Sequence, residues 1–177
     1  VPIQRELRRG VFRYGWHDRR TEQFEHFLSC IDSPDESMLY FGHFLLPHVP
    51  WCYLPSGNHY AFDRESLDLS CLEADYHTIA DELGVAQNQQ RHLLQAMYVD
   101  RLLGRLLDRL AETGLRDRCL LIVTADHGIS FRSGAPRRDL TEKTADDILS
   151  VPLFVKRPGQ YVGNVVDRPV QSVDILP

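Results

Sequence analysis

A long amphipathic pattern followed at once by a short apolar run restricts the fold of this chain more than any other feature of its sequence. Between about residues 88 and 112, leucines recur at spacings of three, four and one, which predicts a helix with one apolar face. Gly114 follows, where a glycine commonly ends a helix. Residues 119–123 are then fully apolar, as expected of a strand buried on both faces. This order of helix, short turn and buried strand is typical of an α/β domain with parallel strands.

The composition is that of one folded domain. The chain has 177 residues, of which 43% are hydrophobic and 25% charged, and these values exclude a disordered chain, collagen and a coiled coil. The formal net charge of −5 argues against nucleic acid as a partner. No run approaches the roughly 18 consecutive apolar residues of a membrane-spanning helix. Any membrane attachment would therefore be made by segments outside this chain.

Neither end of the chain resembles the natural end of a protein. Residues 1–6 lack the basic region, apolar stretch and cleavage site of a secretory signal. The first residue is Val1 rather than methionine, and the sequence stops at Pro177. We therefore expect a piece of a longer protein. Its location, on the outer face of a membrane or in the cytoplasm, is left open.

Four further segments have recognisable patterns. Apolar residues at helical spacing predict a short helix over 24–31. The mostly apolar run 38–46 predicts a strand buried on both faces. Residues 151–156 predict another strand, at a sheet edge or beginning at Pro152, which cannot donate to a neighbour. Residues 52–70 form a long loop whose aromatic side chains favour a functional role.

The cysteines do not form a recognisable metal or redox motif. Cys30, Cys52, Cys71 and Cys119 are spaced 22, 19 and 48 residues apart, so no Cys-x-x-Cys pair exists. We expect buried free thiols, which leave the redox compartment of the protein undecided.

An Asp-His-Gly segment follows the apolar run 119–123. Ligands gather at the carboxyl ends of strands in open α/β sheets, so Asp126 and His127 are placed for function. Neighbouring side chains of a strand point to opposite faces, but Gly128 allows a turn after which both could converge. A carboxylate and an imidazole then form two ligands for Zn²⁺ or Mn²⁺. The alternative is a capping aspartate beside a surface histidine.

A second candidate lies at the end of the run 38–46. Pro47 and Pro50 restrict the backbone on both sides of His48 and so hold its imidazole at low entropic cost. A histidine fixed in this way could bind a metal, donate to an anionic ester oxygen or act as a general acid. His43, deeper in the run, is more typical of a hydrogen-bonded core histidine.

Several cationic side chains follow the Asp-His-Gly segment. Arg132, Arg137, Arg138 and Lys143 could attract an anion. Exposed charges on a loop contribute little by themselves, and we favour a solvated loop for all four.

Three separated segments together resemble the sulfatase-type branch of the alkaline phosphatase superfamily. They are 42–51 with its Pro-His-x-Pro-Trp, 120–128 with an apolar run leading into Asp-His-Gly, and 150–159 with Ser-Val-Pro-Leu-Phe-Val-Lys-Arg-Pro-Gly. Residues 98–107 resemble the long helix before that strand, and 172–177 resemble the segment that closes the catalytic sheet. The segments stand in the family's order, and this order carries the resemblance.

The resemblance implies a three-layer α/β/α sandwich with a mostly parallel sheet, of which this chain holds only a part. It divides the chain into a leader and short helix, 1–37, and the C-terminal portion of a sulfatase-like α/β domain, 38–177. It implies that Asp126 and His127 bind a divalent metal, which could be Mn, Zn, Ca or Mg, and that His48 contacts the substrate, an anionic ester. The metal would activate a Ser, Thr or formylglycine nucleophile against a sulfate or phosphate ester.

The family's nucleophile and the acidic metal ligands of its first strand have no counterpart in this sequence. The signature Cys-x-Pro-x-Arg is absent, because the proline after Cys52 stands one place too late and no arginine follows. We therefore expect part of a metal-dependent sulfatase-like hydrolase that is inactive alone. A phosphoglycerol- or phosphoethanolamine-type transferase on the same fold and a non-catalytic binding module are the alternatives. A sheet without its first strand would expose an edge, so we also expect some homodimer formation.

Overall fold

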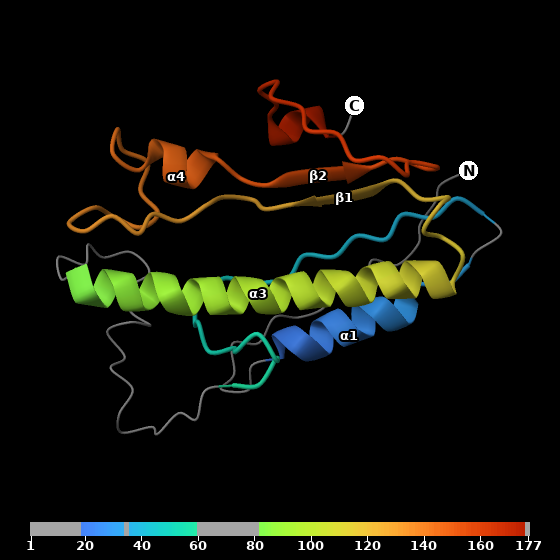
Figure 1. The fold of residues 1–177 in the computed structure, drawn as a ribbon, viewed down its shortest axis with the longest axis horizontal. Coiled ribbons are helices and arrows are strands. Elements are labelled where there is room, and N and C mark those ends of the chain that lie inside the picture. Colours follow the sequence, from blue (N-terminus) through green and yellow to red (C-terminus); the bar gives the residue numbers. More distant parts are fainter. Residues whose placement is uncertain (1–18, 34–35, 60–81, 176–177) are drawn as a thin grey trace, which may run out of the picture.

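The computed structural model describes residues 19–33, 36–59 and 82–175. Figure 1 shows two helices that lie along one side of a two-stranded sheet. Residues 1–18 of the predicted leader and short helix, 1–37, and residues 60–70 of the predicted loop, 52–70, lie outside the described residues. The elements in chain order are α1 (Arg20–Cys30), α3 (Glu82–Glu112), β1 (Leu121–Thr124), α4 (Ala145–Leu149), β2 (Leu153–Lys156) and the 3-10 turn η1 (Ser172–Asp174).

Helix α3 follows from the leucine pattern. The prediction over 88–112 is confirmed, and the helix begins earlier, at Glu82, because the preceding residues are mostly good helix formers. Gly114, at φ 68°, ends the helix, and the N–H of Leu115 donates to the carbonyl of Leu110. Four buried side chains stand four residues apart and so share one face: Tyr98, Leu102, Leu106 and Leu110.

Helix α1 packs against α3, and the two helices form most of the core. The predicted helix over 24–31 is confirmed, with Phe24 and Leu28 buried. The ring of Phe44, from the following segment, lies 5.1 Å from that of Phe24. Each fully buried side chain of this size contributes about 1.5–3 kcal/mol to folding. The core cluster consists of Phe24, Leu28, Ile31, Cys52, Tyr53, Tyr98, Leu102, Leu106 and Leu110.

Strands β1 and β2 form an antiparallel pair, with Leu121 opposite Lys156 and Thr124 opposite Leu153. The expectation of parallel strands is wrong for this pair. The chain leaves β1, forms the short helix α4 and returns to β2 from the same end of the sheet (Figure 1). A parallel pair needs a crossover to the opposite end, and residues 125–152 make none.

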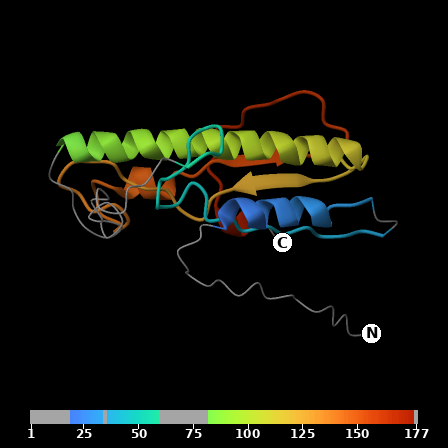
Figure 2. The same cartoon turned by 90° about the horizontal axis from the view of Figure 1, so that it is seen from below.

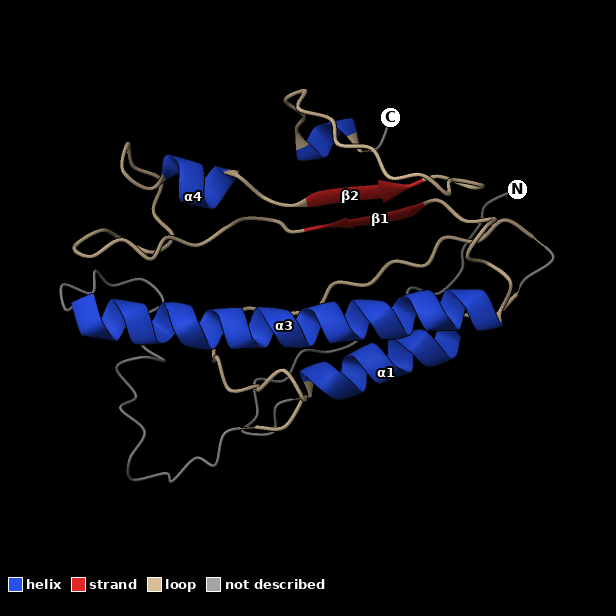
Figure 3. Ribbon diagram, viewed as in Figure 1, coloured by secondary structure: helices blue, strands red, loops and turns tan. Residues whose placement is uncertain are grey.

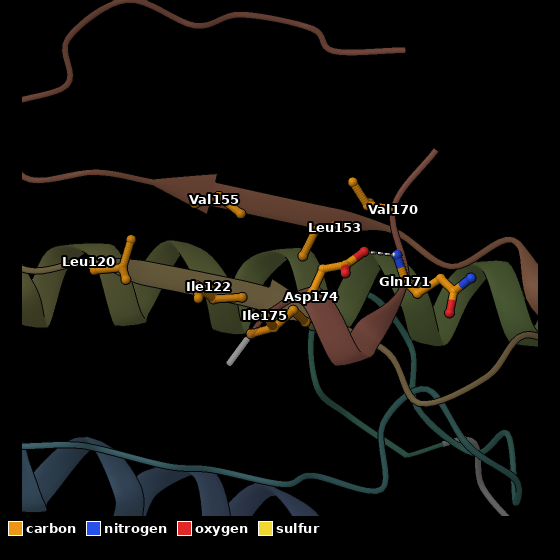
Figure 4. Close-up of a pocket in the computed structure, with 8 residues that line it drawn as sticks. All are labelled: Leu120, Ile122, Leu153, Val155, Val170, Gln171, Asp174 and Ile175. Carbon is orange, nitrogen blue, oxygen red and sulfur yellow. Dashed lines mark hydrogen bonds between the residues drawn. The ribbon is translucent and has the colours of Figure 1, made fainter. Parts of the chain in front are cut away.

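Residues 120–122, at the start of β1, contact apolar groups on both faces of the sheet. Leu121 packs against the helical core, whereas Leu120 and Ile122 line a pocket of about 250 Å³. Strand β2 and the η1 segment supply the rest of this pocket (Figure 4). The apolar character of 119–123 therefore reflects two contacting layers, although the strand itself is only half-buried.

The predicted strand over 38–46 is not formed. The segment runs in the same direction as β1 (Figures 1 and 2), but no backbone hydrogen bond joins the two. Tyr40 and Phe44 pack on the helical core, whereas Leu39 and Phe41 are 85% and 81% exposed. The expectation of burial on both faces is wrong because the described residues cover this segment on one face only.

The described cysteines are free thiols in three different environments. Cys52 is buried, Cys119 is half-buried and Cys30 is exposed, while Cys71 lies outside the described residues. The expectation of buried thiols is confirmed for Cys52. It is wrong for Cys30, which stands at the exposed end of α1.

The secondary structure agrees with an α/β class in its broad sense, since helices pack beside a sheet (Figure 3). Among the described residues the sheet has two strands, and a three-layer sandwich with a mostly parallel sheet is not seen. No helix in the described part of the chain has the length and apolar character needed to span a membrane.

Candidate metal and substrate site

The turn after β1 holds the two predicted metal ligands, Asp126 and His127. The N–H of Gly128 donates to the carbonyl of Ile148 at 2.7 Å, which ties the turn to α4. A Cβ atom at Gly128 would lie 2.0 Å from the carbonyl oxygen of Asp147, so glycine alone fits here. This close approach fixes the backbone directly after the candidate pair.

The structure brings the two candidate side chains together. Asp126 Oδ1 accepts from the backbone N–H of His127 at 3.0 Å, and Asp126 Oδ2 lies 3.8 Å from His127 Nε2. His127 Nδ1 lies 2.8 Å from the carbonyl oxygen of Gly128. A carbonyl only accepts, so Nδ1 carries the hydrogen. In the neutral ring the lone pair is therefore on Nε2, the nitrogen that lies near the Asp126 carboxylate.

The carboxylate of Asp126 and the imidazole of His127 are suitable ligands for a divalent metal. Metal-binding histidines commonly donate their second ring N–H to a carbonyl, and the contact with Gly128 has that form. The Asp126 side chain is 70% exposed, so its carboxylate is accessible to an ion. Over residues 19–33, 36–59 and 82–175, no third His, Cys, Asp or Glu joins the pair in a group that could hold a metal. The pair thus offers two ligands.

The cations that follow His127 have different partners. Arg138 Nη2 lies 2.6 Å from His127 Nε2. Arg132 donates to Asp147 at 2.7 Å, and this hydrogen bond is the main reason why the pKa of Asp147 is lowered. Lys143 is exposed, as expected of a solvated loop. Arg132 and Arg138 are instead bound to specific side chains.

A cluster of rings joins this turn to helix α3 and to the His48 loop. Trp51 lies 5.5 Å from Phe131 and 5.8 Å from His92, and His92 lies 5.3 Å from Phe131, measured between ring centroids. The guanidinium of Arg137 lies 5.3 Å from the centre of the Trp51 ring, and Arg137 is 3% exposed. The expectation of a solvated loop is therefore wrong for Arg137, because it packs on an aromatic face.

We expect His92 to make the stability of the protein depend on pH. Burial lowers its pKa below the ordinary value of 6.5, and its Nδ1 is buried without a hydrogen-bond partner among the described residues. The unfolded chain therefore binds the proton more readily than the folded chain. We expect the free energy of unfolding to fall as the pH is lowered through 6.5, and His92→Gln to reduce this dependence.

Urea unfolding on both sides of pH 6.5 measures this dependence. His26→Gln is the matched control, because His26 is exposed on α1 and is not part of this ring cluster. Equal pH dependence in the wild type and in His92→Gln would contradict the prediction.

A buried arginine fixes the backbone around His48. Arg20 is 7% exposed and donates to the carbonyl oxygens of Leu45 at 3.1 Å, His48 at 2.7 Å and Pro50 at 2.9 Å. Hydrogen bonds from an ionised donor are about twice as strong as neutral ones. The guanidinium therefore holds three carbonyl groups of the loop in place.

A buried glutamine of α3 holds the same loop from the other side. Gln95 is fully buried, and its Oε1 accepts from the N–H groups of Cys52 at 3.0 Å and Tyr53 at 3.2 Å. Its Nε2 donates to the carbonyl oxygen of His48 at 2.8 Å. The carbonyl of His48 thus accepts from both Arg20 and Gln95, and we call these two residues the backbone clamp.

The His48 side chain is oriented by its own neighbour, since its Nδ1 lies 2.8 Å from the carbonyl oxygen of Val49. Within the described residues, His48 does not join Asp126 and His127 in one cluster of metal-type ligands. His43, expected in the core, is exposed. It follows Leu39 and Phe41 on the uncovered face of the segment.

The backbone clamp was missed by the sequence analysis, although a signal was present. Gln95 continues the apolar stripe of α3 one turn before Tyr98, and Arg20 stands one turn before Phe24 on the buried stripe of α1. A long polar side chain on a buried helical stripe needs hydrogen-bond partners. Its presence there could have indicated a backbone segment held by the helix.

The sequence of the chain is similar to those of known sulfatases. A family model described as Sulfatase matches residues 3–177. The chain is 28% identical over 90 residues to the Ulvan-active sulfatase of Formosa agariphila, and the match covers 50% of this chain and 18% of that protein. No solved structure matches significantly. Because the family model covers nearly the whole chain, the protein belongs to the sulfatase family.

Proposed function

We propose that this chain supplies part of the active site of a metal-dependent hydrolase that acts on sulfate or phosphate esters. The observation that carries the proposal is the turn after β1, where a carboxylate oxygen lies 3.8 Å from an imidazole nitrogen whose tautomer is set by Gly128. Membership of the sulfatase family supports it, because the family acts on sulfate esters and generally uses a divalent metal. Residues 38–177 would be the C-terminal portion of the catalytic domain, and 1–37 a leader and short helix.

Asp126 and His127 would hold the metal. When bound, a divalent ion lowers the pKa of a nucleophile and neutralises charge that develops on the ester oxygens. A mixed carboxylate and imidazole pair favours Zn²⁺ or Mn²⁺ over Mg²⁺ and Ca²⁺, which prefer ligand sets made of oxygen alone. The carbonyl of Gly128 supports the pair because it accepts from Nδ1 of His127 and so orients the ring.

His48 would contact the anionic ester through Nε2, because Nδ1 lies against the carbonyl of Val49. The backbone clamp supports this role. It removes the freedom of the loop before substrate arrives, which lowers the entropic cost of placing one imidazole against one oxygen. Arg20 and Gln95 would therefore act as positioning residues rather than as substrate ligands.

The uncovered apolar surface supports a larger sandwich. Leu39 and Phe41 on the segment 38–46 and Phe154 on β2 are 85%, 81% and 63% exposed. Exposed large apolar side chains that follow one another along a segment, as Leu39 and Phe41 do, usually mark a contact with another element. We infer that the complete domain is the three-layer α/β/α sandwich with a mostly parallel sheet. When the rest of the sandwich is absent, the open edge of the sheet is a candidate surface for homodimer formation.

We expect the purified chain to show no metal-dependent hydrolysis of an aryl sulfate or an aryl phosphate. The chemical reason is that the nucleophile signature Cys-x-Pro-x-Arg is absent from its sequence. A colorimetric assay with each ester, with and without Mn²⁺, measures this. Hydrolysis by the wild type that is lost in Asp126→Ala would show that the chain carries its own nucleophile and would overturn this part of the proposal.

A longer protein that includes this chain and a nucleophile segment tests the rest. There, Asp126→Ala should lower the turnover of the aryl ester by at least about a hundredfold, since one metal ligand is lost. Activity unchanged by this substitution would contradict the proposal. Transfer of the group to an added alcohol rather than to water would identify the transferase alternative. Metal and ester binding without any turnover would identify the binding module.

A further inference from the structure

His127 offers a single lone pair for a metal, and an arginine already contacts it. Nδ1 carries the hydrogen that points to Gly128, so the neutral ring presents its lone pair at Nε2. Arg138 Nη2 lies 2.6 Å from that atom. A guanidinium can only donate, so the contact is a hydrogen bond from Arg138 to the Nε2 lone pair.

The same lone pair cannot serve the arginine and a metal at once. A ring nitrogen has one acceptor site, and a coordinated metal would occupy it. A guanidinium and a divalent cation at this distance also repel each other. The two cations therefore exclude one another at Nε2, and the guanidinium must leave before His127 can coordinate.

We propose that Arg138 occupies the metal-binding nitrogen of His127 in the metal-free protein and competes with a metal for it, so that metal binding displaces the guanidinium. The inference rests on the proposed function, because it takes Asp126 and His127 as metal ligands. Arg138 would lower the affinity for metal by the free energy of its own contact with His127, whereas the carbonyl of Gly128 sets the tautomer of the ring.

The nearby cations do not offer the same competition. Arg132 is paired with Asp147 through two hydrogen bonds, at 2.7 and 3.1 Å. Arg137 lies over the ring of Trp51. Lys143 is exposed on the same loop and provides a matched control for the loss of one positive charge.

The test compares Mn²⁺ affinity, measured by calorimetry, in the wild type, Arg138→Met and Lys143→Met. Loss of a charge-assisted hydrogen bond from the metal-free state should raise the affinity of Arg138→Met about tenfold. Lys143→Met changes the net charge equally and should shift the affinity by less than about twofold. A residue with a merely structural role would weaken binding when replaced, so the direction of the change is decisive.

A spectroscopic measurement follows the displacement itself. In ¹⁵N spectra of the histidine rings, the metal-free wild type should show His127 with its hydrogen on Nδ1. Titration with diamagnetic Zn²⁺ should shift Nε2 of His127 and the guanidinium resonances of Arg138 together. Arg138→Gln serves as a second variant if circular dichroism shows that Arg138→Met is not folded.

The outcomes separate this inference from the proposed function. If His127→Ala abolishes Mn²⁺ binding while Arg138→Met binds with wild-type or weaker affinity, the inference is overturned and the metal site stands. If the wild type, Arg138→Met and His127→Ala bind Mn²⁺ equally or not at all, both are overturned. Tighter binding by Arg138→Met that is lost in the double variant with His127→Ala supports both.

Discussion

Replacing Gln95 by methionine should lower the free energy of unfolding by about 2–5 kcal/mol. The side chain is fully buried and makes hydrogen bonds to the N–H groups of Cys52 and Tyr53 and to the carbonyl of His48. Methionine has a similar volume but removes this partner from the N–H groups of Cys52 and Tyr53, and the carbonyl of His48 then keeps its bond from Arg20. Each unsatisfied buried group costs about 1–3 kcal/mol, and partial access of water lowers the sum. Chemical denaturation measures the loss.

The control for this prediction lies on the same helix. Gln90 is exposed, so Gln90→Met should change the stability by less than about 0.5 kcal/mol. A loss below about 1 kcal/mol in Gln95→Met would contradict the assignment of Gln95 to the backbone clamp.

Arg20→Met should cost about 2–4 kcal/mol for a related reason. Three carbonyl oxygens of the His48 loop lose an ionised donor, and Tyr53 loses a guanidinium that lies 5.1 Å from its ring centre. Arg20→Lys keeps the charge but lacks the planar fork that reaches several carbonyls, so it should recover less than half of the loss. Denaturant unfolding of both variants tests this.

Arg19 provides the matched control for Arg20. It is the neighbouring residue and forms an exposed ion pair with Glu22, in which the two side chains are 71% and 64% exposed. Such pairs contribute about 0.2–1 kcal/mol at most, so Arg19→Met should be nearly neutral. Equal losses in Arg19→Met and Arg20→Met would contradict the prediction, because they would reflect charge rather than the buried contacts.

The losses of stability caused by Gln95→Met and by Arg20→Met should not be additive. The carbonyl of His48 accepts from both Arg20 Nη1 and Gln95 Nε2. Either substitution alone loosens the loop, so part of the stability that the other side chain contributes is already lost before the second change. The double variant should therefore lose measurably less than the sum of the single losses, with a coupling energy of about 0.5–3 kcal/mol.

Local patterns predicted the helices well, because helix formation depends on neighbours in sequence. The leucine stripe and Gly114 defined α3, and the spacing of Phe24 and Leu28 defined α1. Strand pairing depends on residues far apart, and there the predictions were weaker. The run 38–46 has the composition of a buried strand, yet among the described residues no strand is paired with it by backbone hydrogen bonds.

The candidate site was predicted in part. The placement of Asp126 and His127 at the end of β1 followed from sequence. Gly128 was expected for its conformational freedom, but the structure requires a glycine there because the carbonyl of Asp147 comes so close. The contacts of Arg138, Arg137 and the backbone clamp did not, because each joins residues that only the tertiary fold brings together. A polar residue on a buried stripe shows that a partner is needed and does not show which one.

The central claim is that Asp126 and His127 form part of a metal site, and Mn²⁺ titration of the purified chain tests it most directly. Mn²⁺ is preferred over Zn²⁺ for this test because exposed histidines elsewhere bind Zn²⁺ readily. Calorimetry would compare the wild type with Asp126→Ala, with His127→Ala and with the control Asp139→Ala, which changes an exposed aspartate of the same loop. We predict that each of the first two variants weakens binding by at least about tenfold while the control does not. Equal Mn²⁺ affinity in all four proteins would contradict the claim.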